Sequence, residues 1–262
     1  MATLQNRTRE IVNEIRLETQ ALSRRFGALN AVKEVNFRLE VGARHALIGP
    51  NGAGKTTFIN LLTGVLPPTD GRVLLAGRNI TDKVQAERVK LGIARTFQIN
   101  RLFRGLSVLE NVCIPVAERV GAARSMFCPT GWRTDVIEES MYLLEMLKLA
   151  DAAGHRVSDL PYGRQRLVEL AIAIGLKPEV LLLDEPAAGV PSAESHIILD
   201  ALESLPQDIA VLIIEHDMDV VFRFAQRITV MVAGAVLAEG TPREIEANPQ
   251  VREVYLGQVG HG

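Results

Sequence analysis

Short hydrophobic runs of two kinds predict the strands of this chain. Runs rich in apolar or β-branched residues lie near residues 17–23, 32–39, 44–48 and 72–76. Two further runs, Val180–Leu183 and Ala210–Ile214, are continuously apolar. Because a strand without polar alternation is covered on both faces, these two runs predict buried strands of a parallel sheet.

Helical periodicity predicts the elements between these strands. A core-facing helix is indicated by apolar residues at three- and four-residue steps, namely Leu167, Leu170, Ala171 and Ile174. Another helix is expected to include Phe58–Leu62. Residues of about 104–158 contain no strand-like run, and Met141–Leu149 has helical spacing. This segment is therefore predicted to be a mainly helical insertion.

Turn and cap residues define the remaining boundaries. Val230–Glu239 is predicted to be a hairpin that turns at Ala233-Gly234. Thr241-Pro-Arg-Glu244 combines a helix N-cap, a first-turn proline and a capping-box glutamate. The alternation of strands and helices predicts a three-layer α/β fold with a mainly parallel sheet. Residues 1–16 are expected to form a polar, helical extension, and residues 17–262 one domain.

Composition narrows the class of protein. The 262 residues are 47% hydrophobic and 23% charged, as in ordinary globular proteins. A net charge of −2 provides no basic field, which excludes nucleic acid as the main partner. Cys113 and Cys128 match no metal or redox spacing and suggest a reducing cytosol. The longest apolar runs, such as Ile228–Ala238, are shorter than the roughly 20 residues that cross a bilayer, so a soluble, at most peripheral protein is expected.

Residues 49–57 carry the first chemical motif, a phosphate-binding loop of the pattern G-x4-G-K-T between a predicted strand and a predicted helix. Its glycines let backbone N–H groups surround a β-phosphate, and the helix start adds partial positive charge. Lys55 is predicted to contact the β- and γ-phosphates, and the Thr56 hydroxyl to bind Mg²⁺. The candidate nucleotide-binding residues of this loop are Gly49, Pro50, Asn51, Gly52, Ala53, Gly54, Lys55, Thr56 and Thr57.

Two carboxylates at the end of the run Val180–Leu183 complement this loop. A carboxylate at the end of a buried strand can help to hold Mg²⁺ beside a phosphate-binding loop, which makes Asp184 a candidate metal ligand. Glu185 follows directly and is predicted to polarise the water that attacks the γ-phosphate. Together, the two motifs predict binding and hydrolysis of ATP with Mg²⁺.

These motifs resemble those of the ATP-binding-cassette (ABC) ATPases, and the resemblance extends from about residue 17 to 257. It implies a RecA-like P-loop NTPase core, an antiparallel β subdomain and a helical subdomain at about 104–158. Phe26 matches the family's adenine-stacking aromatic residue. Gln98 matches the glutamine that senses Mg²⁺ and the attacking water. His216 matches the switch histidine that contacts the γ-phosphate.

The stretch Leu160-Pro-Tyr-Gly-Arg-Gln-Arg166 resembles the family's signature loop, which is commonly Leu-Ser-Gly-Gly-Gln. Pro161 replaces the serine, so the serine contact to phosphate is absent, whereas N–H groups near Gly163 and the helix dipole remain. Tyr162 and Gly163 are candidate nucleotide-binding residues; Tyr162 either forms a wall of the site or packs against the helical subdomain, and packing is favoured. Val190-Pro-Ser192 stands where many members have Leu-Asp in the loop that crosses the dimer interface.

A narrower resemblance is to the branched-chain (hydrophobic) amino-acid uptake subfamily. It rests on residues 94–103, 160–166, 183–189, 214–218, 240–242 and 254–257. It implies a bacterial or archaeal importer ATPase, peripheral to the cytoplasmic face of the inner (plasma) membrane. The implied partners are transmembrane permease subunits, a second identical or related ABC ATPase subunit and, indirectly, a periplasmic solute-binding protein. Relatives also handle urea, short amides or aromatic acids, so the resemblance does not define the solute.

Three other functions are alternatives to import. An ABC exporter subunit, such as a lipopolysaccharide-transport ATPase, resembles the same subfamily at the C-terminus. A non-transport ABC ATPase usually carries tandem cassettes, long coiled-coil insertions or basic arms, none of which occurs in this sequence. A small-molecule P-loop kinase fits poorly, because Gln98, Asp184-Glu185 and His216 indicate water as the acceptor.

Overall fold

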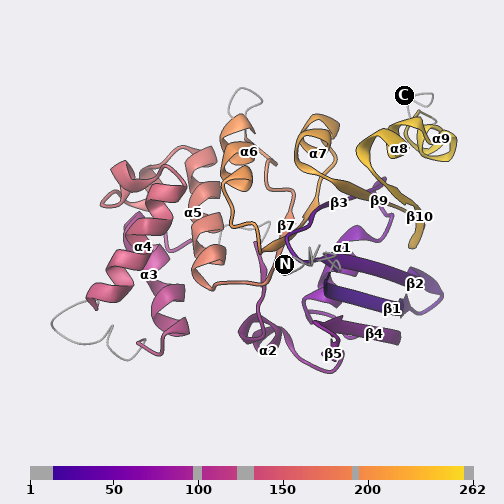
Figure 1. Cartoon of the computed structure of the whole chain (residues 1–262), viewed down its shortest axis with the longest axis horizontal. Coiled ribbons are helices and arrows are strands. Elements are labelled where there is room, and N and C mark those ends of the chain that lie inside the picture. Colours follow the sequence, from indigo (N-terminus) through magenta and orange to yellow (C-terminus); the bar gives the residue numbers. More distant parts are fainter. Residues whose placement is uncertain (1–13, 97–101, 123–132, 191–194, 257–262) are drawn as a thin grey trace, which may run out of the picture.

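A computed structural model of the chain describes residues 14–96, 102–122, 133–190 and 195–256 (Figure 1). Its larger sheet has the strand order β10-β9-β3-β8-β7-β6. The strands are β3 (Arg44–Ile48), β6 (Ile93–Arg95), β7 (Val180–Asp184), β8 (Ala210–Ile214), β9 (Arg227–Val232) and β10 (Ala235–Gly240). Neighbouring strands run parallel apart from the β9–β10 hairpin, so the predicted mainly parallel sheet is confirmed.

A second, antiparallel sheet has the order β2-β1-β4-β5. Its strands are β1 (Ile15–Phe26), β2 (Leu29–Glu40), β4 (Asp70–Leu75) and β5 (Arg78–Asn79). It lies at the opposite end of the molecule from helices α3 and α4 (Figure 1). The antiparallel β unit that the resemblance implied is therefore present.

The helices pack around these sheets. They are α1 (Lys55–Leu62), α2 (Gln85–Lys90), α3 (Val108–Arg119), α4 (Thr134–Met146), α5 (Tyr162–Gly175), α6 (Ser195–Glu203), α7 (Met218–Phe224), α8 (Pro242–Ala247) and α9 (Pro249–Leu256), with short 3-10 helices η2 (Ala150–Ala152) and η3 (Val157–Asp159). Thr241 caps α8 in the expected box, accepting from the Glu244 N–H while Glu244 accepts from the Thr241 N–H. Within the described residues, no helix is both long and apolar enough to cross a bilayer.

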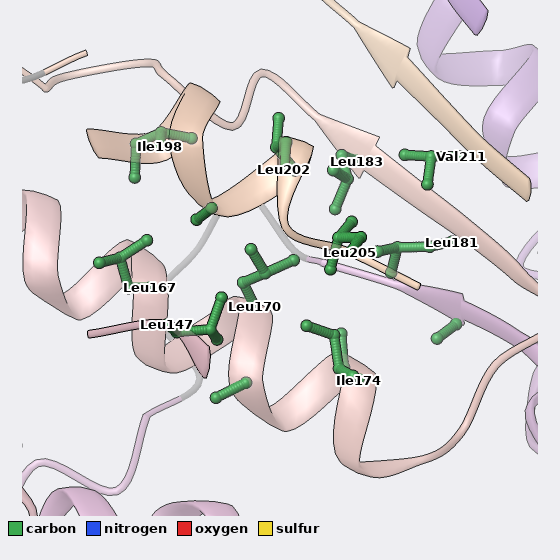
Figure 2. Packing of buried hydrophobic residues seen from close by; sticks show 14 of the residues in the cluster. Leu147, Leu167, Leu170, Ile174, Leu181, Leu183, Ile198, Leu202, Leu205 and Val211 are labelled. Atoms are coloured by element: carbon green, nitrogen blue, oxygen red, sulfur yellow. The ribbon is translucent and has the colours of Figure 1, made fainter. Parts of the chain in front are cut away.

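The alternation of side chains along β7 produces the three layers. Leu181 and Leu183 pack with α5 and α6, as the neighbouring side chains of Figure 2 show. Val180 and Leu182 face the other way, into a cluster formed with α1 and the antiparallel sheet. Since fully burying such a side chain contributes about 1.5–3 kcal/mol, the strand is fixed from both sides. This explains why its sequence lacks polar alternation.

The segment predicted as a helical insertion contains α3, α4, η2 and η3 in its described part. Its second helix ends earlier than the pattern Met141–Leu149 suggested: α4 stops at Met146, and Lys148 has a left-handed φ of 56°. The predicted extension at residues 1–16 lies mostly outside the described residues. The division into subdomains stays a prediction.

His45 of β3 is a buried histidine between the two sheets. Its side chain is in hydrogen-bonding contact with the Thr229 hydroxyl, Nε2 to Oγ1 2.8 Å, and its ring meets that of Phe37 edge to face at 5.0 Å. Burial lowers its pKa to about 4; Glu239 opposes this shift and Arg227 adds to it. His45 belongs to none of the sequence motifs, and these contacts show that it is a structural residue.

This environment predicts a pH dependence of stability that His45→Gln should reduce. Because the folded-state pKa lies below the unfolded value of about 6.5, His45 favours folding fully above that pH and less as pH falls towards 4. Between about pH 7 and 4.5, the wild-type free energy of unfolding should fall by about 2–3 kcal/mol more than that of the variant. Urea unfolding at both pH values measures this difference. Exposed His155→Gln should behave as wild type, and an equal loss in His45→Gln would contradict the prediction.

Candidate functional site

The ends of three parallel strands lie at one edge of the larger sheet. In the register, Leu47 of β3 is opposite Ile214 of β8, and Ile214 is opposite Asp184 of β7. The residues that follow these strands therefore leave the sheet at nearly the same level, which is where ligands bind in open α/β sheets. This edge brings together the phosphate-binding loop, Glu185 and His216.

The phosphate-binding loop is enclosed by neighbouring backbone. A Cβ atom on Gly49 would lie 2.2 Å from the Met231 carbonyl oxygen, and one on Gly54 would lie 2.3 Å from that of Ala31. The turn between β9 and β10 also contacts the loop, since the Gly234 N–H donates to the Ala53 carbonyl at 3.0 Å. Both oxygen atoms belong to the backbone of neighbouring strands and cannot move aside as a flexible side chain would. Only glycine therefore fits at positions 49 and 54.

Lys55 begins α1 and folds back over its own loop. Its ammonium donates to the carbonyl oxygens of Gly49 and Pro50, at 2.5 and 3.1 Å. Burial lowers the pKa of the Lys55 ammonium, while Glu185 and Asp184 act to raise it. The lysine is thus held at the mouth of the loop, where phosphate oxygens could replace the carbonyl acceptors.

An open pocket of about 680 Å³ lies over this loop. The predicted site residues that line it are Asn51, Gly52, Ala53, Gly54, Lys55, Thr56, Thr57 and Glu185. Its other wall is formed by residues of β2 and the preceding turn, namely Ala28, Leu29, Asn30, Ala31 and Lys33. Sequence reasoning missed this wall, because the residues carry no motif and their place depends on how β2 packs against the loop.

Glu185 and His216 approach each other across β7 and β8. The Glu185 Oε1 atom lies 3.7 Å from His216 Nδ1. Glu185 has a left-handed φ of 50°, and its N–H donates to the Ile214 carbonyl at 2.9 Å. A non-glycine residue in this conformation carries a backbone strain of about 1–3 kcal/mol that the surroundings must hold. The chain therefore turns sharply at Glu185, directly after the end of β7.

Asp184 is paired with Arg95, a residue to which sequence reasoning gave no role. The Arg95 guanidinium donates to Asp184 Oδ2 at 2.7 Å and to Asn60 Oδ1 of α1 at 2.6 Å. The side chains of the pair are only 10% and 2% exposed. The sequence could have pointed to Arg95, because it is a basic residue within residues 94–103, one of the segments that carry the subfamily resemblance. This pair ties β6, α1 and β7 together beneath the loop.

The oxygen donors at this edge fit Mg²⁺. Magnesium usually takes one or two carboxylates, with phosphate and water oxygens completing its shell. The Asp184 carboxylate and the Thr56 hydroxyl supply donors of that kind, and Thr56 lines the pocket. Among the described residues, no group of three or more His, Cys, Asp or Glu side chains could hold a metal ion by itself. The carboxylate and hydroxyl donors are of the kind that a hard cation takes beside a nucleotide.

Phe26 ends β1 close to the pocket wall. Its ring is 43% exposed, and the Arg24 guanidinium lies 4.7 Å from the ring centre. The pocket lining begins two residues later, at Ala28. An exposed ring at this position is available to a planar ligand, and its role as adenine platform stays a prediction.

The signature-like stretch lies apart from the pocket that Lys55 lines. Pro161 is the N-cap of α5, and Gly163 in the first turn is buried. Tyr162 packs near Gly189, in the loop after β7: a Cβ on Gly189 would lie 3.0 Å from the tyrosine ring. The Arg166 guanidinium lies 5.0 Å from the centre of the same ring. Neither alternative predicted for Tyr162, a site wall or packing against the helical subdomain, included this contact.

Several predicted features lie outside the described residues. They are Gln98, the predicted catalytic and Mg²⁺-sensing glutamine, and Pro191 and Ser192 of the dimer-interface loop. Their proposed roles rest on the sequence alone.

Comparison with known proteins gives the family. A family model described as ABC transporter matches residues 32–188, and one described as branched-chain amino acid ATP-binding cassette transporter matches residues 235–261. A relative from Archaeoglobus fulgidus, the probable branched-chain amino acid transport ATP-binding protein LivG, is 38% identical. The match covers 92% of this chain and 95% of that relative.

Solved structures agree with the sequence relatives. An ATP-binding cassette of an ABC transporter in its ADP conformation superposes with a TM-score of 0.82 and 32% identity, covering 93% of this chain and 99% of that one. A dimeric cassette in a post-hydrolysis state, bound to ADP and Pi, gives a TM-score of 0.71 and 25% identity over 87% and 99%. Together with the motifs at the sheet edge, these matches show that the chain belongs to the ABC transporter family, as an ATP-binding cassette with ATPase activity.

Proposed function

We propose that this protein is the ATP-hydrolysing subunit of an importer for branched-chain amino acids or a related small solute. The observation that carries the proposal is the convergence of Lys55, Glu185 and His216 at one sheet edge. Relatives that match over 92–93% of the chain are branched-chain amino acid transport ATP-binding proteins, which favours import over the export that the sequence left open. The name of the LivG relative supports the same solute class.

The phosphate-binding loop binds the triphosphate. Residues 51–56 line the pocket, so their backbone N–H groups and the start of α1 would surround the phosphates, and Lys55 would exchange its carbonyl acceptors for phosphate oxygens. Thr56 and Asp184, with Gln98 from the sequence, would hold Mg²⁺. When bound, Mg²⁺ neutralises charge on the phosphates and orients them.

Glu185 and His216 act on the attacking water. The Glu185 carboxylate is the acceptor that polarises the water, and the His216 imidazole donates to the γ-phosphate side of the reaction. Their separation of 3.7 Å permits both to reach one reacting centre. The constrained backbone of Glu185 limits the directions in which its side chain can point.

A second subunit completes the site in this proposal. Tyr162 and Gly163 are absent from the lining of the pocket over Lys55, which fits a head-to-tail dimer whose signature stretch faces the partner's nucleotide. The dimeric cassette bound to ADP and Pi supports a dimer of such subunits. Dimer closure would move permease subunits at the cytoplasmic face of the membrane, and a periplasmic binding protein would deliver the solute. The helical subdomain at 104–158 would follow that closure.

Lys55→Ala should abolish useful nucleotide binding. Removing the ammonium deletes charge-assisted contacts to two phosphates, so the Kd for ATP should rise about 100-fold. Titration with a fluorescent ATP analogue measures this change. Lys90→Ala, an exposed change on α2, should leave the Kd unaltered. A Lys55→Ala protein that binds ATP like wild type would contradict the assignment of the loop.

Glu185→Gln should separate binding from hydrolysis. The amide keeps the shape of the side chain but cannot accept a proton, so kcat should fall about 100- to 1000-fold. ATP should still bind, and dimers should accumulate in size-exclusion chromatography with ATP. The exposed Glu253→Gln on α9 is the matched control. Undiminished hydrolysis in Glu185→Gln would show that Glu185 does not polarise the water.

Reconstitution with the permeases and binding protein of its own transport system tests import directly. In proteoliposomes that display the cassette outside, ATP should drive radiolabelled leucine, presented by the binding protein, across the bilayer from the opposite side. The Glu185→Gln protein should support none of this transport. The proposed solute class would be wrong if leucine were not transported and did not stimulate ATP hydrolysis, while another solute did both.

A further inference from the structure

Glu215 is a buried carboxylate close to the predicted catalytic residues Glu185 and His216. It follows β8 directly and is only 1% exposed. Its two oxygens have separate partners: Oε1 accepts the Ala187 N–H at 3.1 Å, and Oε2 accepts the His216 N–H at 3.2 Å. One side chain therefore links two backbone segments that leave neighbouring strands.

Both segments carry the chemistry proposed above. Ala187 lies two residues after Glu185, in the turn where Glu185 takes its left-handed φ of 50°. The other end of that turn is fixed to β8, because the Glu185 N–H donates to the Ile214 carbonyl. The turn is thus held to the end of β8 at both ends, once by backbone and once by the Glu215 side chain.

The imidazole of His216 lies near both carboxylates. Its Nδ1 atom is 3.7 Å from Glu185 Oε1 and 3.9 Å from Glu215 Oε2. The two carboxylates differ in exposure, since the Glu185 side chain is 31% exposed and that of Glu215 only 1%. Glu185 can therefore meet water, whereas Glu215 serves the backbone behind it.

A buried carboxylate at this position requires compensation. Burial raises the pKa of the Glu215 carboxyl, and the N–H groups of Ala187 and His216 oppose that shift. Burial of a charged group is unfavourable unless hydrogen bonds replace its water. Two acceptor oxygens on one group match two backbone donors, which neither an amide nor an apolar side chain can do.

We propose that Glu215 is a positioning residue for ATP hydrolysis, which holds the Glu185 turn and the His216 backbone in one fixed relation through its two oxygens. The inference rests on the roles proposed for Glu185 and His216. It assigns Glu215 no contact with the nucleotide or the attacking water. Its effect is on the rate of hydrolysis and leaves the phosphate-binding loop unchanged.

Glu215→Gln provides the sharpest test, because it preserves shape and volume. One oxygen becomes an NH₂ group that faces a backbone N–H, so only one of the two links can remain. We expect kcat for ATP hydrolysis to fall about 10- to 100-fold, as for other ångström-scale misplacements of catalytic groups. The Kd for a fluorescent ATP analogue should stay within about twofold of wild type, since the loop itself is intact.

Glu244→Gln is the matched control for the chemical change. Glu244 also accepts a backbone N–H, from Thr241, but it lies in the capping box of α8. Glutamine fits a capping box as well as glutamate does, so hydrolysis should be unaffected. Glu215→Asp is the second variant: it keeps the charge and both oxygens but is one methylene too short to span both segments. It carries the test if Glu215→Gln does not fold.

The outcomes separate this inference from the proposed function. Wild-type kcat in Glu215→Gln would show that the side chain only fills space, and a Kd that rises as kcat falls would show a general defect of the fold. Either result overturns the inference. If Glu185→Gln abolishes hydrolysis while Glu215→Gln does not, the proposed function stands without the positioning role. If Glu185→Gln hydrolyses ATP normally, the proposed function fails first.

Discussion

The site depends on one constraint: strands β3, β8 and β7 end at the same level of the larger sheet. Their hydrogen-bonded register puts Leu47, Ile214 and Asp184 side by side. Each strand is buried on both faces, so a one-residue slip would move its side chains into the opposite cluster and disrupt the packing of both clusters. Core packing therefore sets the positions of the loop, the carboxylates and the histidine more firmly than any contact among them.

Around that edge, the irregular backbone is held by groups that are themselves fixed. The phosphate-binding loop is enclosed by carbonyl groups of β2 and β9, and the turn at Glu185 is tied to the end of β8. The buried Arg95–Asp184 pair adds a charge balance beneath the loop. Breaking a buried pair by removing one partner typically costs about 3–5 kcal/mol, so this link is also a structural one. These fixed neighbours hold Glu185 in its strained left-handed conformation.

Sequence predicted the parts of this arrangement that depend on local pattern. The runs Val180–Leu183 and Ala210–Ile214 became β7 and β8 because two-sided burial removes polar alternation. The short elements β6 and α2 were missed, since a three-residue strand or a single helical turn and a half is defined by its neighbours. For the same reason, the contacts Arg95–Asp184, Tyr162–Gly189 and Glu215–Ala187 could not be derived, because each joins segments far apart in the chain.

A crystal structure of the wild-type protein with Mg²⁺ and a non-hydrolysable ATP analogue would show whether the nucleotide binds at this sheet edge. We expect phosphate density against the backbone of the loop and Lys55, with Mg²⁺ near Thr56 and Asp184. Glu185 and His216 should flank the γ-phosphate, without rearrangement of the sheet edge. A triphosphate bound elsewhere, or one with Glu185 directed away from the γ-phosphate, would contradict this expectation.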